Sequence, residues 1–106
     1  MTSLTLYSEC LERVRSVLVF FSTTGKVNAA VLAELESEVR ATVSSAHAAM
    51  LPIADVDADL ERIAAMTLPE VAASTASRAM RRWIVTASER IGAPMPPRLP
   101  GDEARP

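Results

Sequence analysis

Apolar residues recur along most of this chain at intervals of three and four positions, the spacing that gathers side chains on one face of an α-helix. These stripes predict helices at residues 3–21, 28–50, 56–65 and 68–91. The connections between them are short, so sequential helices should pack antiparallel. The pattern therefore predicts an all-α fold, an antiparallel helical bundle of three long helices and one short helix.

Glycine marks two of the expected helix ends. Gly25 follows the first predicted helix and Gly92 follows the last, and each can adopt the left-handed conformation that closes a helix. Residues 93–106 carry five prolines and should form an extended, disordered tail. We therefore divide the chain into a helical bundle domain at 1–92 and a Pro-rich C-terminal tail at 93–106.

Other residues mark the expected helix starts. Asp55 is the predicted N-cap of the third helix. Thr67 and Glu70 have the spacing of a capping box, in which each side chain accepts from the other residue's backbone N–H. Met66 and Val71 then stand where a hydrophobic staple would close over the beginning of the fourth helix.

Composition narrows the classes of partner. Hydrophobic residues make up 49% of the chain and aromatic residues 4%, so the predicted core is aliphatic and alanine-rich. A net charge of −2 gives no overall attraction for nucleic acid or an anionic membrane. The apolar run 17–21 is far shorter than the about 20 residues that span a bilayer, and the N-terminus has no signal-peptide pattern. We expect a small soluble domain in the cytoplasm, without a membrane partner.

Cysteine and histidine, two residue types that often carry catalysis or bind metals, each occur once in this chain. Cys10 is the only cysteine and falls on an apolar helix face, where we expect a buried, reduced thiol without a basic neighbour. His47 is the only histidine, and a di-iron bundle would need a glutamate three positions earlier, where this chain has Ser44. We expect His47 to lie at the surface, and we expect no catalytic residue, no metal and no cofactor.

The acidic segment 55–59 has the aspartate spacing of the first half of an EF-hand calcium loop. That loop requires glycine at its sixth position and glutamate at its twelfth, where this chain has Leu60 and Met66. Acidic residues are also favoured at a helix N-terminus by the helix dipole. We interpret the segment as a helix start.

The segment 68–84 resembles a helix-turn-helix of the excisionase type. The resemblance covers about a sixth of the chain and lies in Glu70-Val71-Ala72, Ser77-Arg78-Ala79 and Arg81-Arg82-Trp83-Ile84. It implies a DNA-binding regulator whose arginines contact phosphates or base edges. The motif needs a turn between its two helices, and residues 73–76 contain no helix breaker. Because one helix gives this segment a continuous apolar face, we predict a single helix here.

Apolar outliers and separated charges indicate an interaction surface. Val19 and Phe20 fall outside the apolar stripe of the first helix, and Val85 falls among arginines. Residues 27–62 carry seven acids and two arginines, a net charge of −5, whereas residues 78–90 carry four arginines and one glutamate, a net charge of +3. Such groups can pair within one chain or between two. The predicted interface residues are Val19, Phe20, Arg78, Arg81, Arg82 and Val85.

These observations favour a non-catalytic helical interaction module that forms a homo-oligomer or binds another helical protein. Two alternatives remain open. One is a DNA-binding regulator that uses the Arg-rich face of the fourth helix. The other is a small all-α enzyme or binder with an apolar ligand pocket between helices.

Overall fold

A computed structural model describes residues 3–25 and 28–92, which form four helices and no strand. The helices are α1 (Ser3–Thr24), α2 (Ala29–Ala48), α3 (Ile53–Thr67) and α4 (Glu70–Arg90). The all-α prediction is therefore confirmed for this part of the chain. The predicted tail at 93–106 lies outside the described residues.

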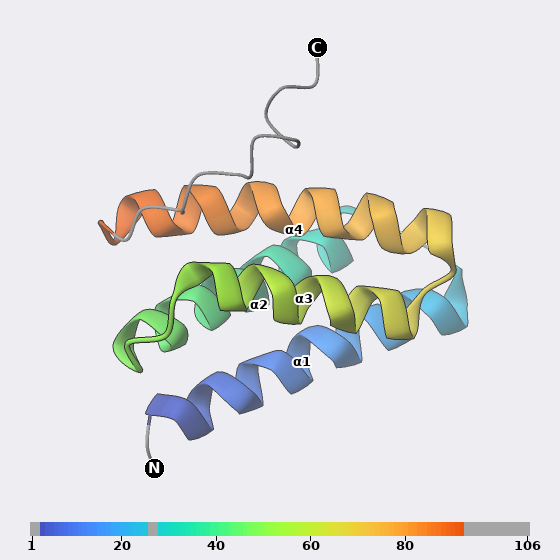
Figure 1. Cartoon of the computed structure of the whole chain (residues 1–106). Coiled ribbons are helices and arrows are strands. Elements are labelled where there is room, and N and C mark those ends of the chain that lie inside the picture. The colour runs from blue at the N-terminus through green and yellow to red at the C-terminus, as the bar shows by residue number, and fades with distance from the viewer. Residues whose placement is uncertain (1–2, 26–27, 93–106) are drawn as a thin grey trace, which may run out of the picture.

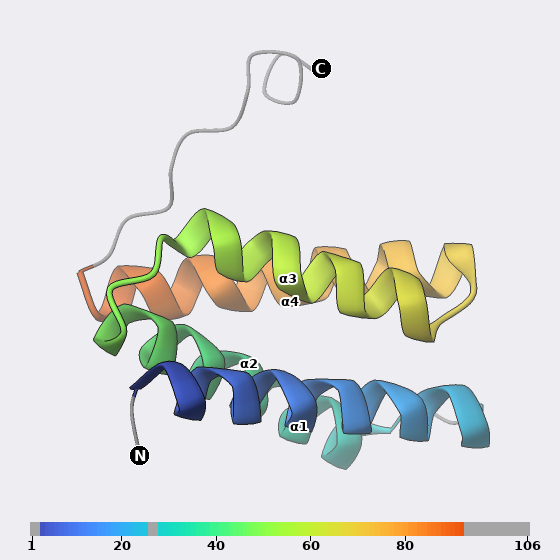
Figure 2. The ribbon, with the colours of Figure 1, turned by 60° about the horizontal axis from the view of Figure 1, so that its bottom comes forward.

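The helices pack in two pairs, α1 with α2 and α3 with α4, and α2 and α3 each contact all three other helices. α1 makes its most extensive contacts with α2, and α3 makes its most extensive contacts with α4. α2 also packs on α4 and α3, and α1 packs on α3. In both Figure 1 and Figure 2, α1 and α4 lie on opposite sides of the molecule, and no contact joins them in the described residues. The chain turns back at each connection in Figure 1.

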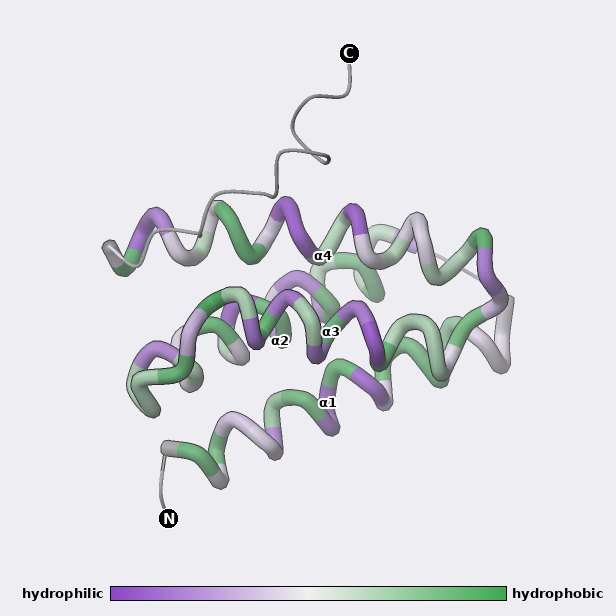
Figure 3. Tube along the Cα trace, viewed as in Figure 1, coloured by the Kyte–Doolittle hydropathy of each residue, from purple (hydrophilic) through white to green (hydrophobic). Residues whose placement is uncertain are grey.

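The core is aliphatic and lies where the predicted stripes converge. Side chains with no exposed area come from every helix: Val14 and Leu18 of α1, Val39, Val43 and Ala46 of α2, Val56 and Ala64 of α3, and Ile84 of α4. Figure 3 shows apolar and polar positions alternating along each helix, so that only one stripe of each can face this core. Each fully buried leucine, isoleucine or valine contributes roughly 1.5–3 kcal/mol.

Tyr7 is the aromatic residue of the core, and it ties α1 to α3. Its side chain is only 5% exposed, and its hydroxyl donates a hydrogen bond to Asp59 Oδ2 across 2.7 Å. Burial and the adjacent Asp59 carboxylate raise the pKa of Tyr7 above its ordinary value. The phenol therefore remains a donor to Asp59 throughout the neutral range.

The glycine predictions are confirmed, and the α2–α3 turn adds a residue that the sequence did not mark. Gly25 and Gly92 both have positive φ, 67° and 75°. α2 ends at Ala48, two residues before its predicted end, and Met50 follows with φ of 61°. The Met50 and Leu51 N–H groups donate to the carbonyls of His47 and Ala46, which is the Schellman arrangement. Met50 thus occupies a position that usually holds glycine.

The predicted cap at Asp55 is wrong. α3 begins at Ile53 with Pro52 as its N-cap, and Asp55 lies in the first turn, where its N–H donates to the Pro52 carbonyl. The reason is that Ile53 is itself a buried member of the stripe, so the helix must begin before Asp55 to deliver it to the core. The interpretation of the acidic segment as a helix start survives, since Asp55 is the acidic residue of that first turn.

The predicted capping box is also wrong. Thr67 is the last residue of α3, and α4 begins at Glu70 after Pro69, without a side-chain cap. Leu68 has extended backbone, because the residue before a proline is disfavoured in the helical region. The N-cap of α4 is therefore Pro69 and not Thr67. The staple fails as well, since Met66 is 79% exposed and Val71 is 80% exposed.

Candidate functional site

A surface groove of about 920 Å³ lies between α3 and α4 and is called the α3–α4 groove below. The α3 side contributes Asp57, Glu61 and Ala65. The α4 side contributes residues one helical turn apart, from Glu70 at its start to Val85. At 1.5 Å per residue this stretch of α4 is about 22 Å long. The groove therefore has the length of a helix of several turns.

Charges of both signs line the α3–α4 groove. Arg81 of α4 forms an ion pair with Asp57 of α3, and both side chains are only 21% exposed. Arg78 and Arg82 are exposed beside this pair and form no ion pair within the described part of the chain. Glu61 on the α3 side is exposed as well. The groove thus keeps guanidinium groups available on one side while Asp57 and Arg81 hold its two helices together.

Apolar residues also line the groove. Ala73 is buried there, and Leu68 and Val85 are half-buried. The sequence predicted Val85 as an exposed outlier among arginines, whereas in the structure it is half-buried in the lining of the α3–α4 groove. Protein–protein interfaces likewise combine apolar residues at their core with polar residues at their rim.

A second, smaller hollow of about 350 Å³ lies between α1 and α2. Phe20, Val17 and Val31 contribute its apolar lining, and Glu34 and Glu38 stand beside them. Phe20 is 51% exposed and Val19, next to it on α1, is 41% exposed. The prediction that these two residues fall outside the core is therefore confirmed.

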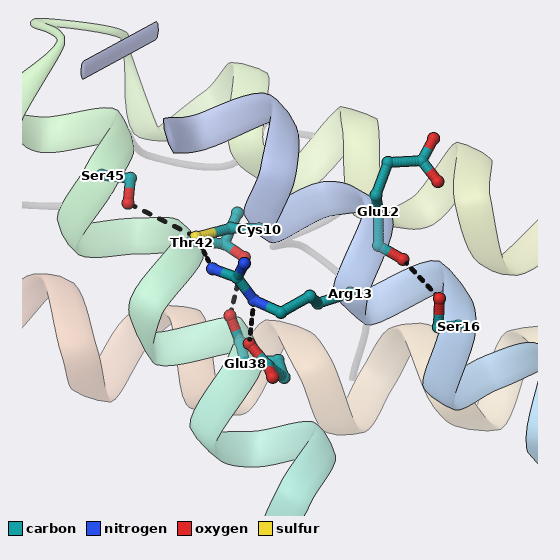
Figure 4. Close-up of polar contacts among 7 residues, drawn as sticks. All are labelled: Cys10, Glu12, Arg13, Ser16, Glu38, Thr42 and Ser45. Atoms are coloured by element: carbon teal, nitrogen blue, oxygen red, sulfur yellow. Dashed lines mark hydrogen bonds and ion pairs between the residues drawn. The ribbon is translucent and has the colours of Figure 1, made fainter. Parts of the chain in front are cut away.

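Arg13 joins α1 to α2 at the edge of this hollow. Its Nε donates to Glu38 Oε1 across 3.0 Å, and its Nη2 donates to Cys10 Sγ across 3.1 Å, as Figure 4 shows. The hydrogen bond from Arg13 to Glu38 raises the pKa of the guanidinium above its ordinary value. Cys10 Sγ also lies 3.5 Å from Ser45 Oγ of α2.

Cys10 is buried, as predicted, but the expectation that it lacks a basic neighbour is wrong. Arg13 lies one turn further along α1, and its long side chain reaches back over the thiol. The thiol is only 1% exposed, so these contacts serve the α1–α2 packing.

The structure divides the predicted interface residues into two groups. Arg78, Arg81, Arg82 and Val85 gather in the α3–α4 groove. Val19 and Phe20 lie on α1, which does not contact α4 in the described residues. The sequence reasoning missed Glu61 and Glu34, one in each hollow. A signal existed for Glu61, which lies four positions after Asp57 and so on the same helix face.

The other residues and motifs considered from the sequence do not come together in a site among the described residues. His47 is exposed on α2, and no group of three metal-ligating side chains occurs among residues 3–25 and 28–92. α4 runs without a break from Glu70 to Arg90, so the single-helix prediction is confirmed and the turn of a helix-turn-helix is missing. Over the same ranges, no helix has the length and apolar content that crossing a bilayer requires.

In comparisons with known proteins, no family model matches the chain, and neither a curated protein nor a solved structure matches it significantly. The functional interpretation therefore depends on the two surfaces described above.

Proposed function

We propose that this chain is a non-catalytic interaction module, an antiparallel helical bundle that assembles with itself or binds another helical protein. One observation carries the proposal. The α3–α4 groove is lined by apolar and charged residues and has the length of a helix of several turns, and it contains Arg78, Arg81, Arg82 and Val85. Helix-in-groove recognition uses this combination of apolar anchors and flanking charges.

The groove chemistry supports binding rather than catalysis. Ser74 and Ser77 supply hydroxyl groups in the groove. Within the described residues neither hydroxyl hydrogen-bonds to a histidine or a carboxylate that could act as its base. The arginines are suited to orienting a partner through its carboxylates. A single cysteine held as a buried free thiol also supports the cytoplasmic location that we expect.

DNA binding remains the second candidate, and Arg78 and Arg82 favour it. They lie one turn apart on the exposed face of α4 and form no ion pair in the described residues. Against it, Asp57, Glu61 and Glu70 line the same groove and would repel phosphates. The balance of charge therefore fits a protein partner better than a polyanion.

The test is the mass of the protein in solution, measured by light scattering for the wild type and for Arg82→Glu. We expect the wild type to form dimers or larger species at high micromolar concentration. Arg82→Glu should dissociate at concentrations at which the wild type is assembled, because the variant reverses an unpaired charge at the groove rim. Arg15→Glu is the matched control, since Arg15 is 57% exposed on α1 and lines neither hollow.

Two results would contradict parts of the proposal. A wild type that remains strictly monomeric would contradict self-association and leave binding to another helical protein as the proposed function. A duplex DNA that binds at low salt, with an affinity that falls steeply as salt increases and is lost in Arg82→Glu, would favour the DNA-binding alternative.

A further inference from the structure

We propose that copies of this chain assemble head to tail, with the α1 ridge of one copy seated in the α3–α4 groove of the next. The name α1 ridge is used here for the exposed apolar neighbours Val19 and Phe20, of which Phe20 also borders the α1–α2 hollow. The inference rests on the proposed self-association and specifies which surface meets which. Its grounds are exposed apolar area, charge and the placement of the two surfaces.

Exposed apolar area favours the α1 ridge as the occupant of the groove. Phe20 is the largest exposed apolar side chain among the described residues, and Ala73, Leu68 and Val85 contribute apolar area to the lining of the groove. Seating Phe20 there removes apolar surface from water on both copies.

Charge favours the same pairing. Glu34 is exposed in the hollow that Phe20 lines, and it forms no ion pair in the described residues. Arg78 and Arg82 are exposed in the groove, also without an ion pair in that part of the chain. When the ridge enters the groove, a carboxylate beside the ridge meets guanidinium groups at the rim. Complementary charges of this kind fix the register and speed the encounter.

The two surfaces cannot meet within one molecule. The ridge lies on α1 and the arginines lie on α4, and these helices occupy opposite sides of the bundle in Figures 1 and 2. An interface that joins different surfaces of identical copies is heterologous, and it continues into a ring or an open filament. The wild type should therefore form a series of sizes rather than a single dimer.

Two variants that each remove one surface test this directly. Phe20→Ser removes the ridge and leaves the groove intact, whereas Arg82→Glu damages the groove and leaves the ridge intact. Both positions are exposed, and circular dichroism with a thermal melt should show that each variant folds like the wild type. The readout is the mass by light scattering of each variant alone and of the equimolar mixture.

We expect each variant alone to be monomeric at concentrations at which the wild type is assembled. The mixture should form a 1:1 dimer of twice the 11.4 kDa chain mass and nothing larger, because only one ridge and one groove remain functional in the pair. As control, Arg15→Glu mixed with Phe20→Ser should also assemble, but into species larger than a dimer, since Arg15→Glu retains both surfaces.

Other outcomes overturn the inference in distinguishable ways. A wild-type dimer that Arg82→Glu breaks and Phe20→Ser leaves intact would overturn head-to-tail assembly and leave the proposed interaction function standing. Monomeric variants whose mixture also stays monomeric would overturn it as well. A monomeric wild type would overturn both the inference and the self-association on which it rests.

Discussion

The Tyr7–Asp59 hydrogen bond offers the sharpest test of how this small core is held together. Tyr7 is the only tyrosine in the chain, its ring is buried between α1 and α3, and its hydroxyl donates to a carboxylate across 2.7 Å. Tyr7→Phe removes the hydroxyl and leaves the ring packing in place. The substitution therefore isolates the hydrogen bond.

The expected cost follows from the surroundings of the acceptor. Hydrogen bonds to charged groups contribute about 1.5–3 kcal/mol. Asp59 is partly exposed and also accepts from Arg62. In Tyr7→Phe, water can therefore donate to the Asp59 carboxylate and replace part of the lost hydrogen bond. We expect Tyr7→Phe to lower the free energy of unfolding by about 1–2 kcal/mol. For a domain of this size, each kcal/mol lowers the thermal unfolding midpoint by roughly 4–8 °C.

The assay is urea unfolding followed by circular dichroism, combined with a double-mutant cycle between Tyr7→Phe and Asp59→Ala. A coupling energy of about 1 kcal/mol or more is expected, because each substitution removes the same bond. Arg62→Ala is the control, since it removes the other partner of Asp59 and leaves the tyrosine contact. A coupling energy near zero would refute the reasoning.

The same bond predicts a dependence on alkaline pH. Because the pKa of Tyr7 is raised in the folded state, its stabilising effect is complete below the unfolded tyrosine pKa of about 10 and declines as pH rises above it. Up to the raised pKa, the slope should approach about 1.4 kcal/mol per pH unit. Tyrosinate absorbance reports Tyr7 alone in this chain. Ionisation with an ordinary tyrosine pKa in the folded protein would contradict this prediction.

Two further predictions concern helix ends. Met50→Gly should raise the free energy of unfolding, measured by urea titration, by about 0.5–1 kcal/mol, since glycine adopts a positive φ without the steric cost that methionine incurs. Met50→Ala, which keeps the Cβ, is the control and should give no gain. Asn28→Ala should lower the free energy of unfolding by about 1 kcal/mol, because the Asn28 side chain accepts from the Val31 N–H at the start of α2. Asn28→Asp retains an acceptor at this position and should melt at about the wild-type temperature.

The helices and their buried faces could be predicted because apolar periodicity is a local property. Leu18, Val39 and Ile84 all belong to stripes that are visible in the sequence, and all three are buried. The outlying positions of Val19 and Phe20 could be predicted for the same reason, since a helix that buries one face must expose the other.

Helix boundaries were harder to predict because local signals compete. Thr67 and Glu70 have the spacing of a capping box, but Pro69 forces extended backbone onto Leu68 and moves the boundary past Thr67. At Asp55 the need to bury Ile53 outweighs the capping preference of the aspartate. The deciding residues, Pro69 and Ile53, are visible in the sequence. The sequence does not show how strongly each of them competes with the capping signal.

The candidate site depends on which helices become neighbours, and periodicity does not contain that information. The arginines of α4 were visible as a group. The acidic partners Asp57 and Glu61 became part of the same groove only through the packing of α3 on α4. Arg13 was missed as a neighbour of Cys10 because its contact depends on the rotamer of a long side chain.

The measurement that tests the central claim most directly is the absolute mass of the wild-type protein, determined by light scattering across a concentration series. The account predicts a mass that exceeds the 11.4 kDa of one chain and increases with concentration through several species. A mass of one chain at every concentration up to the high micromolar range would contradict it.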